Sequence, residues 1–191
     1  GATPIWHDHT DQLANDMPLY LVANEFFDAL PIRQMVRDGD AWRERQVGVE
    51  NNDLAFGLSA PAPLSALKHR FEDTKDGDLV EFCPQAPAIM QSIAQRIDTN
   101  GGTALIFDYG DWRSLGDTLQ ALHAHKKVDA LHKPGQSDLT AHVDFEALVA
   151  DLREMESLPE EQYKKMLHRL FRQWHPDKCH WRKKLNTARG S

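Results

Sequence analysis

The stretch "LVANEFFDALPI", residues 21–32, decides the fold. Its apolar beginning is typical of a buried strand, and Asn24–Glu25 ends the apolar run abruptly. A second stretch, "TALIFDYG" at residues 103–110, follows the same pattern and ends in Asp108–Tyr109–Gly110. In an open α/β sheet, ligands bind beyond the carboxyl ends of the strands. We therefore expect the two polar strand ends to form a single rim.

The residue types at this rim favour a cationic ligand. Glu25 and Asp28 can accept hydrogen bonds from an amine or a guanidinium, and bidentate carboxylate recognition suits a guanidinium especially well. The alternative is structural: polar groups at strand ends also cap helices and pin turns, and Asp28 would then cap the turn that ends at Pro31. Spacing alone favours the structural interpretation slightly, because short motifs match often by chance.

The remaining pattern predicts a mixed α/β chain. A hairpin is expected over residues 32–49, with Asp38–Gly39 at its turn. Strands are expected at the start of residues 54–71 and at residues 78–84. Helices are expected at residues 85–98, ended by Asn100–Gly101–Gly102, and at residues 116–125, 145–155 and 157–174. Residues 133–145 are expected to form a loop.

Charge divides the chain unevenly. The net charge is −7, which argues against general nucleic-acid binding. The first 150 residues hold twelve Lys/Arg and twenty-three Asp/Glu, whereas residues 151–191 hold ten and six, so a boundary near residue 150 is expected. The sequence has no apolar run of membrane-spanning length. No metal site is expected, because His123 and His125 would not face one another on a helix, and Cys83 and Cys179 lie far apart.

Several long motifs carry a family resemblance. "LVANEFFDALPIRQMV", "WRERQVGV", "VEFCPQAPAI", "GGTALIFDYG" and "HKPGQSDLTAHVDF" resemble, over about residues 3–149, the MidA family of mitochondrial complex I assembly methyltransferases. The resemblance implies a class I methyltransferase sheet, S-adenosylmethionine as cofactor, an arginine of a complex I subunit as methyl acceptor, and a mitochondrial location. It implies a substrate rim made by Asn24, Glu25 and Asp28. The other family-motif residues are Pro31, Asp108, Tyr109, Gly110, Gly135, Asp138, Thr140, His142 and Asp144.

The chain departs from this family at the cofactor loop. In the family, a glycine-rich turn upstream of these motifs holds S-adenosylmethionine, whereas Gly101–Gly102 here precedes a strand. We therefore expect an α/β fold built from a partial class I methyltransferase (Rossmann-like) sheet with an inserted β-hairpin, followed by a C-terminal helical segment. Residues 1–149 would match the C-terminal half of the family domain. This chain alone would hold no cofactor, and another protein chain would cover its open sheet edge and apolar face.

The C-terminal residues 150–191 carry a different signal. Ser157 and Glu160 form a capping box before a helix whose large apolar residues recur at 3–4 spacing, and the helix ends at His175–Pro176–Asp177. This pattern resembles the second helix and loop of a DnaJ-type domain (J domain). The resemblance implies that His175, Pro176 and Asp177 contact a DnaK-type chaperone. The alternative, an amphipathic helix stopped by a proline, stays open.

Three hypotheses about function follow from the sequence. The first is a MidA-type arginine methyltransferase that is complete only with its cofactor-binding half. The second is a structural or assembly subunit without catalysis. The third is a DnaJ-like co-chaperone.

Overall fold

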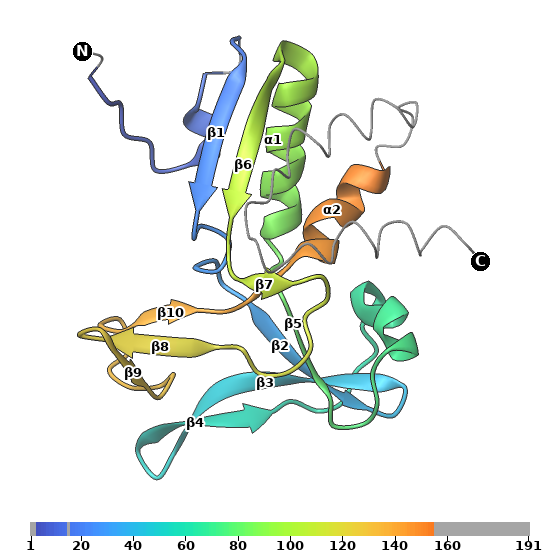
Figure 1. Ribbon diagram of the computed structural model, residues 1–191. Helices are drawn as coiled ribbons and strands as arrows, with labels where there is room; N and C mark the ends of the chain where they lie inside the picture. The colour runs from blue at the N-terminus through green and yellow to red at the C-terminus, as the bar shows by residue number, and fades with distance from the viewer. Residues whose placement is uncertain (1–2, 15, 155–191) are drawn as a thin grey trace.

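The computed structural model describes residues 3–14 and 16–154 of the chain (Figure 1). The predicted helix at residues 157–174 and the His175–Pro176–Asp177 loop lie outside the described residues, and the domain division near residue 149 stays a prediction. No helix within the described residues is long and apolar enough to cross a membrane. A short 3-10 helix, η1 (Thr10–Gln12), precedes the first strand.

A parallel strand pair and two helices form the first layer. Strand β1 (Leu19–Asn24) pairs with β6 (Gly102–Phe107), from Leu19 opposite Gly102 to Asn24 opposite Phe107. Helix α1 (Ala86–Asn100) lies along one face of this pair, and α2 (Phe145–Glu154) packs against α1 (Figure 1). The first core lies between these elements, because α1 buries the apolar side chains that recur along one of its faces. The predicted strands and helices in this layer are confirmed. The core includes Ala23, Phe27, Met90, Ile93, Ile97, Ala104, Ile106 and Leu148.

The glycine pair before β6 has a backbone role. Gly101 ends α1 with φ +80°, a conformation that favours glycine. Gly102 has φ +117°, and a Cβ atom there would lie 2.0 Å from the carbonyl oxygen of Leu19. The close approach of β1 to β6 therefore requires glycine at position 102.

An antiparallel sheet forms the second layer, with strand order β4-β3-β2-β5. Its strands are β2 (Arg33–Asp38), β3 (Ala41–Glu50), β4 (Asp53–Leu58) and β5 (Leu79–Phe82). A second core forms where Met35, Trp42 and Val80 meet the 3-10 helix η2 (Ser65–Glu72), and Phe71 stacks on Trp42 at 5.4 Å. The predicted hairpin is confirmed, but its turn lies one residue later, because Asp38 still pairs with Ala41. The 3-10 helix was not predicted.

The prediction of a helix at residues 116–125 is wrong. This region forms β8 (Gln120–His123) and β9 (Lys126–Val128), joined by a tight turn in which Ala124 and His125 have φ +49° and +61°. Two consecutive left-handed residues cannot lie within an α-helix. Strand β10 (Asp138–Thr140) pairs with the other edge of β8, in the region expected to be a loop. Two very short strands, β7 (Gly110–Asp111) and β11 (Val143–Asp144), pair in parallel before α2 begins.

Both edges and one face of the first layer stay open. Among the described residues, β1 and β6 pair only with each other, so neither outer edge has a neighbouring strand. On the face away from α1, Tyr20 and Val22 are 78% and 66% exposed. Within the described residues, the structure thus has the open edge and the uncovered apolar side chains that the sequence predicted.

Candidate functional site

The ends of β1 and β6 meet at one rim, as predicted. Asn24 lies opposite Phe107, and the backbone N–H of Glu25 donates to the Phe107 carbonyl at 2.8 Å. Glu25 therefore lies beside Asp108, the next residue after β6. The Glu25 side chain is exposed, and its backbone has φ +49°. Positive φ is uncommon for residues other than glycine, and such strained positions concentrate at functional sites.

Asp108 organises the loop that follows β1. Its Oδ2 accepts hydrogen bonds from the backbone N–H groups of Phe27 at 2.8 Å and Asp28 at 3.3 Å, and its Oδ1 accepts from the N–H of Tyr109 at 2.9 Å. Burial raises the pKa of Asp108 above its ordinary value, although these backbone hydrogen bonds oppose the change. Both oxygens have donors from the chain itself, so Asp108 positions the rim.

Asp28 differs from Asp108, because one of its oxygens has no partner. The residue is 5% exposed, and Oδ1 accepts no hydrogen bond. Burial raises the pKa of Asp28, and the negative charges of Asp108, Glu25 and Asp138 raise it further. An unpaired buried carboxylate oxygen is costly, and an incoming donor would satisfy it. A backbone hydrogen bond from Ala29 opposes this rise in pKa and fits the alternative role of Asp28 at a turn, but it leaves Oδ1 without a partner.

Aromatic side chains flank the carboxylates. Tyr109 is 59% exposed, and its pKa is raised by the charge of Glu25 and by a hydrogen bond to that carboxylate. Phe26 is partly exposed and packs edge-on against the buried Phe27, with ring centroids 5.2 Å apart. Carboxylates beside aromatic faces attract a planar cation through hydrogen bonds and cation–π contact. The sequence analysis missed Phe26, although its position directly after a strand end was a usable signal.

The other family-motif residues separate into two groups. Asp138, at the start of β10, lies close enough to raise the pKa of Asp28, and the N–H of Ala141 donates to the Asp28 carbonyl at 2.9 Å. The β8–β10 region therefore borders the rim.

The residues of the second group fit roles in backbone conformation and backbone contacts. Gly110 is needed where β7 meets β11, since a Cβ there would lie 2.1 Å from the Val143 carbonyl oxygen. Gly135 has φ +77°, and the N–H of His142 donates to Thr118 Oγ1 at 2.8 Å. Thr140 ends β10, and Pro31 lies in the segment between the rim and β2. The contacts of these residues are to the backbone and to neighbouring loops, so their motif positions fit a structural role.

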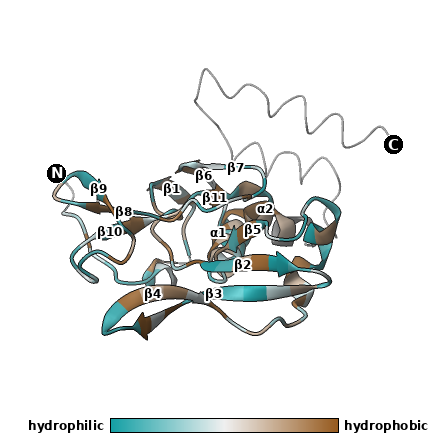
Figure 2. Ribbon diagram, turned by 90° about the horizontal axis from the view of Figure 1, so that it is seen from below, coloured by the Kyte–Doolittle hydropathy of each residue, from teal (hydrophilic) through white to brown (hydrophobic). Residues whose placement is uncertain are grey.

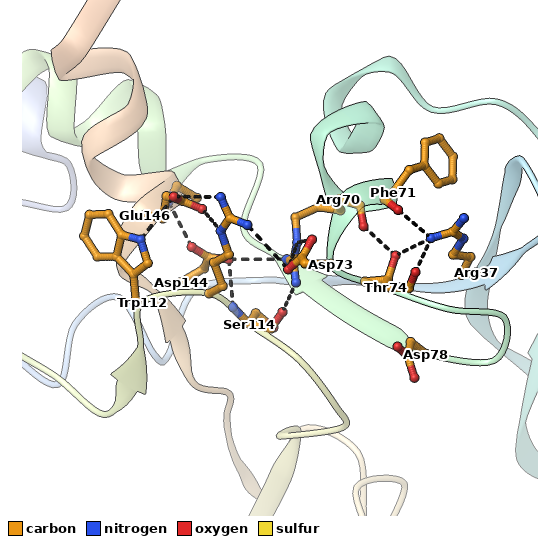
Figure 3. A network of polar contacts seen from close by, with 12 residues as sticks. Arg37, Arg70, Phe71, Asp73, Thr74, Asp78, Trp112, Ser114, Asp144 and Glu146 are labelled. Carbon is orange, nitrogen blue, oxygen red and sulfur yellow. Dashed lines mark hydrogen bonds and ion pairs between the residues drawn. The ribbon is translucent and has the colours of Figure 1, made fainter. Parts of the chain in front are cut away.

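Asp144 belongs to a structural network (Figure 3). Its Oδ1 accepts from the N–H of Ala147 at 2.9 Å, so Asp144 caps the first turn of α2. Its Oδ2 accepts from the N–H of Ser114 at 2.9 Å and lies 3.8 Å from Nη1 of Arg70. Arg70 is 2% exposed and also donates to the Ser114 carbonyl at 2.6 Å. Arg70 also pairs with Asp73 at 3.0 Å, but its other partners, Ser114 and Asp144, lie far away along the chain, so no local pattern marks this arginine as buried.

The described residues hold no metal-type cluster. Within residues 3–14 and 16–154, no group of three or more His, Cys, Asp or Glu side chains converges as metal ligands do. The rings of His123 and His132 pack edge to face, with their centroids 5.5 Å apart.

The described residues do not by themselves fit S-adenosylmethionine. The turns after β1 and β6 carry Asn24–Glu25 and Asp108–Tyr109, and neither is a glycine-rich turn into a helix. Gly101 and Gly102 are used to end α1 and to admit the Leu19 backbone. The rim presents carboxylates and aromatic rings suited to a cation, whereas a glycine-lined cradle is not found within residues 3–14 and 16–154.

Comparison with known proteins gives one consistent family. Residues 1–163 match the family described as "Putative S-adenosyl-L-methionine-dependent methyltransferase". The chain is 39% identical over 148 residues to the mitochondrial protein arginine methyltransferase NDUFAF7 of Xenopus laevis. This match covers 76% of this chain and 33% of the relative. It is 36% identical over 146 residues to the human NDUFAF7, and this match covers 75% of this chain and 32% of the relative. The chain thus spans about a third of the length of these relatives.

A solved structure gives the same result. The crystal structure of a COG1565 superfamily member from Burkholderia thailandensis, bound to S-adenosyl-homocysteine, matches with a TM-score of 0.60 and 25% identity, over 75% of this chain and 39% of that one. On the family match, the relatives and this fold, the chain belongs to the S-adenosyl-L-methionine-dependent methyltransferase family.

Proposed function

We propose that this chain forms the substrate-binding part of a protein arginine methyltransferase. The names of the NDUFAF7 relatives support the acceptor class, and the neighbouring structure bound to S-adenosyl-homocysteine supports the cofactor. The observation that carries the proposal is the buried, unpaired Oδ1 of Asp28 at an acidic and aromatic rim. A guanidinium offers several N–H donors in one plane and fits this arrangement better than the single ammonium of lysine.

The rim residues would bind and orient the guanidinium. Glu25, exposed at the strand end, takes one edge of the planar cation, and Asp28 Oδ1 takes an N–H that points into the loop. Asp108 holds the loop in place through its backbone hydrogen bonds. Methylation of a guanidinium nitrogen releases one proton, and the raised pKa of Asp28 suits that carboxylate to accept it. S-adenosylmethionine would supply the methyl group and would leave as S-adenosylhomocysteine.

A second protein segment completes the proposed enzyme. The free edge of β1 and the exposed Tyr20 and Val22 offer a surface on which a cofactor-binding part would continue the sheet. The share of the relatives that this chain covers, about a third, supports such a division. Because these relatives are named mitochondrial, we propose the same location for this protein.

Complementation tests the proposal. The chain is co-expressed with the N-terminal part of the Xenopus laevis relative, and methylarginine formed in a digest of mitochondrial proteins is measured by mass spectrometry. We expect methylarginine and no methyllysine from the pair, and loss of product with Asp28→Asn. A pair that forms a stable complex, binds S-adenosylmethionine and methylates no arginine would refute the proposal. That result would instead favour the non-catalytic assembly subunit, which the same open β1 edge supports.

The co-chaperone hypothesis rests on residues 157–178, outside the described part of the chain. It stays a prediction from the sequence, and a substitution at His175 tests it below.

A further inference from the structure

The hairpin of β3 and β4 extends beyond the sheet as an arm. β2 pairs with β3 from Gln34 opposite Arg45 to Asp38 opposite Ala41. Beyond Arg45, residues 46–50 of β3 pair with β4 alone, down to Glu50 opposite Asp53. Figure 1 shows this arm extending beyond β2 and β5, the other strands of the same sheet. We call residues 46–57 the arm. A two-stranded ribbon is barely stable by itself in water, so its apolar face gains from a partner.

One face of the arm is apolar and exposed. Residues directly opposite in an antiparallel pair share a face, so Val47 and Phe56 lie beside Val49 and Leu54. Val47, Val49 and Leu54 are 53%, 73% and 42% exposed, and Leu58, 52% exposed, extends the row. Figure 2 shows brown segments along this arm and teal at its tip. The opposite face carries small and polar residues: Gln46, Gly48, Glu50, Asp53, Ala55 and Gly57.

The base of the apolar row is held rigid. The Arg45 guanidinium lies 3.8 Å from the centroid of the Phe56 ring and pairs with Asp117 at 2.6 Å. Arg45 Nη1 also donates to Gln34 Oε1 at 3.2 Å. Phe56 is therefore fixed from one side by a cation that is itself tied to the sheet, while the side chains further along the arm remain open. A preorganised apolar surface loses little conformational entropy when a partner binds.

The edge and the tip specify the chemistry of that partner. Among the described residues, β4 pairs with β3 alone, so its outer edge is free for six residues, from Asp53 to Leu58. Free edges of this kind take up an extended segment as an added strand. At the tip, Glu50 and Asp53 lie directly opposite one another, which is unfavourable for two like charges. A basic residue of the partner would relieve this repulsion.

We propose that the free edge of β4 binds an extended, apolar and basic segment of the methyl-accepting protein, with its apolar side chains on Val47, Val49 and Leu54 and a basic side chain between Glu50 and Asp53. This inference rests on the proposed function, since it concerns the substrate of the same enzyme. A protein that presents an arginine to the acidic rim is basic at that point, and the tip of the arm has the same sign of charge as the rim. The arm would supply affinity for the protein, and the rim would select the arginine.

Binding of a labelled peptide tests the inference separately from methylation. The probe is a fluorescein-labelled decapeptide in which valine and lysine alternate, so that it offers no guanidinium to the rim. Fluorescence anisotropy measures its affinity for the 191-residue chain. We expect the Val47→Thr/Val49→Thr double variant to weaken binding tenfold or more, because threonine keeps the β-branched shape and removes a methyl contact at each position. Gln46→Thr, on the opposite face of the same strand, should leave the affinity unchanged.

Further variants and control peptides test which partner binds the apolar face of the arm. Glu50→Gln/Asp53→Asn should weaken binding and flatten its salt dependence, and a matched valine–glutamate peptide should not bind. Asp28→Asn should leave the affinity of the lysine probe unchanged, so a failure of the rim and a failure of the arm are separable. Equal affinities of wild type and the double valine variant would overturn the inference. A dimer in sedimentation that the double valine variant dissociates would also overturn it, because the face would then join two copies of this chain.

Discussion

The buried Asp28 and the partly buried Asp144 both have raised pKa values, but their stability should respond oppositely to substitution by asparagine. Asp28 and Asp144 both have pKa values raised by burial above the ordinary 3.8. Asp28 Oδ1 has no donor, whereas the two oxygens of Asp144 accept from the N–H groups of Ala147 and Ser114. An amide has one acceptor oxygen, so Asp144→Asn places an NH₂ group against one of these two donors. We expect Asp28→Asn to stabilise the fold and Asp144→Asn to destabilise it.

The magnitudes follow from the contacts. Leaving a buried polar group unpaired costs about 1–3 kcal/mol, and more for a charged group. Replacing the Asp28 carboxylate by a neutral amide removes the charge and its repulsion by Asp108, Glu25 and Asp138, which we put at about 1 kcal/mol of added stability at pH 7. Asp144→Asn loses a helix cap worth about 1 kcal/mol. It also loses a charge-assisted contact with Ser114, so a loss of about 2–3 kcal/mol is expected.

The sign of the pH dependence is fixed by the raised pKa. Between pH 3.8 and the raised pKa of Asp28, the folded protein binds more protons than the unfolded chain. The contribution of Asp28 to the free energy of unfolding therefore falls as pH rises through this window. The Asp28→Asn variant lacks that fall. Its advantage over wild type should be largest at pH 7 and should disappear below about pH 3.8.

Urea unfolding at pH 7 and pH 4, followed by far-ultraviolet circular dichroism, measures both variants against wild type. Titration of each variant with an arginine-containing peptide gives the second readout, and Asp28→Asn should lose affinity while it gains stability. If Asp28→Asn lowers the free energy of unfolding at pH 7 by more than about 1 kcal/mol, the oxygen is not an unpaired functional group. The account of the rim would then be wrong.

Four further predictions test other parts of the structure. In the complemented enzyme, Glu25→Gln should lower the rate of methylation about tenfold or more, as expected for the loss of a charged hydrogen bond of at least about 1.4 kcal/mol. Asp144→Asn, compared at equal concentration of folded protein, should lower the rate less. Gly102→Ala should destabilise the chain by about 2 kcal/mol or more in urea, because its Cβ would meet the Leu19 carbonyl oxygen, whereas Gly48→Ala, with nothing within 4 Å, should change stability by less than about 0.5 kcal/mol. Calorimetric titration of the chain alone with S-adenosylmethionine should show no micromolar binding, and such binding would mean that the cofactor site lies in this chain. If the C-terminal segment acts as a DnaJ-type domain, His175→Gln should abolish stimulation of a DnaK-type ATPase while the thermal midpoint of the chain stays unchanged.

Long apolar patterns made the first layer predictable. The strand ends at Asn24 and at Asp108 follow continuous apolar runs, and α1 follows a clear 3–4 periodicity, so their type and their meeting at one rim could be read from the sequence. The strands β8 to β10 were missed because each has three or four residues, too few to establish a period. In addition, β10 pairs with β8 across a long loop, which no local pattern announces.

The division of roles at the rim was not predictable in the same way. The sequence placed Asp28 and Asp108 together, but both are simply aspartates after apolar runs. Their difference depends on the path of the backbone after Glu25, which turns the N–H groups of Phe27 and Asp28 toward Asp108. No local pattern encodes that path, since Glu25 has φ +49° and its N–H bonds to the carbonyl of Phe107, a residue far along the chain.

The polar network of Figure 3 determines how the chain can come apart. The two apolar cores do not merge: one lies under α1, the other between η2 and the antiparallel sheet. Arg70, from η2, contacts Ser114 and Asp144, the last residue of β11, and Arg113 pairs with Glu146 of α2, so polar contacts join the two parts. Salt and pH weaken contacts of this kind, whereas each core depends on the exclusion of water. We therefore expect amide exchange to reach the two cores at different rates when this network is loosened.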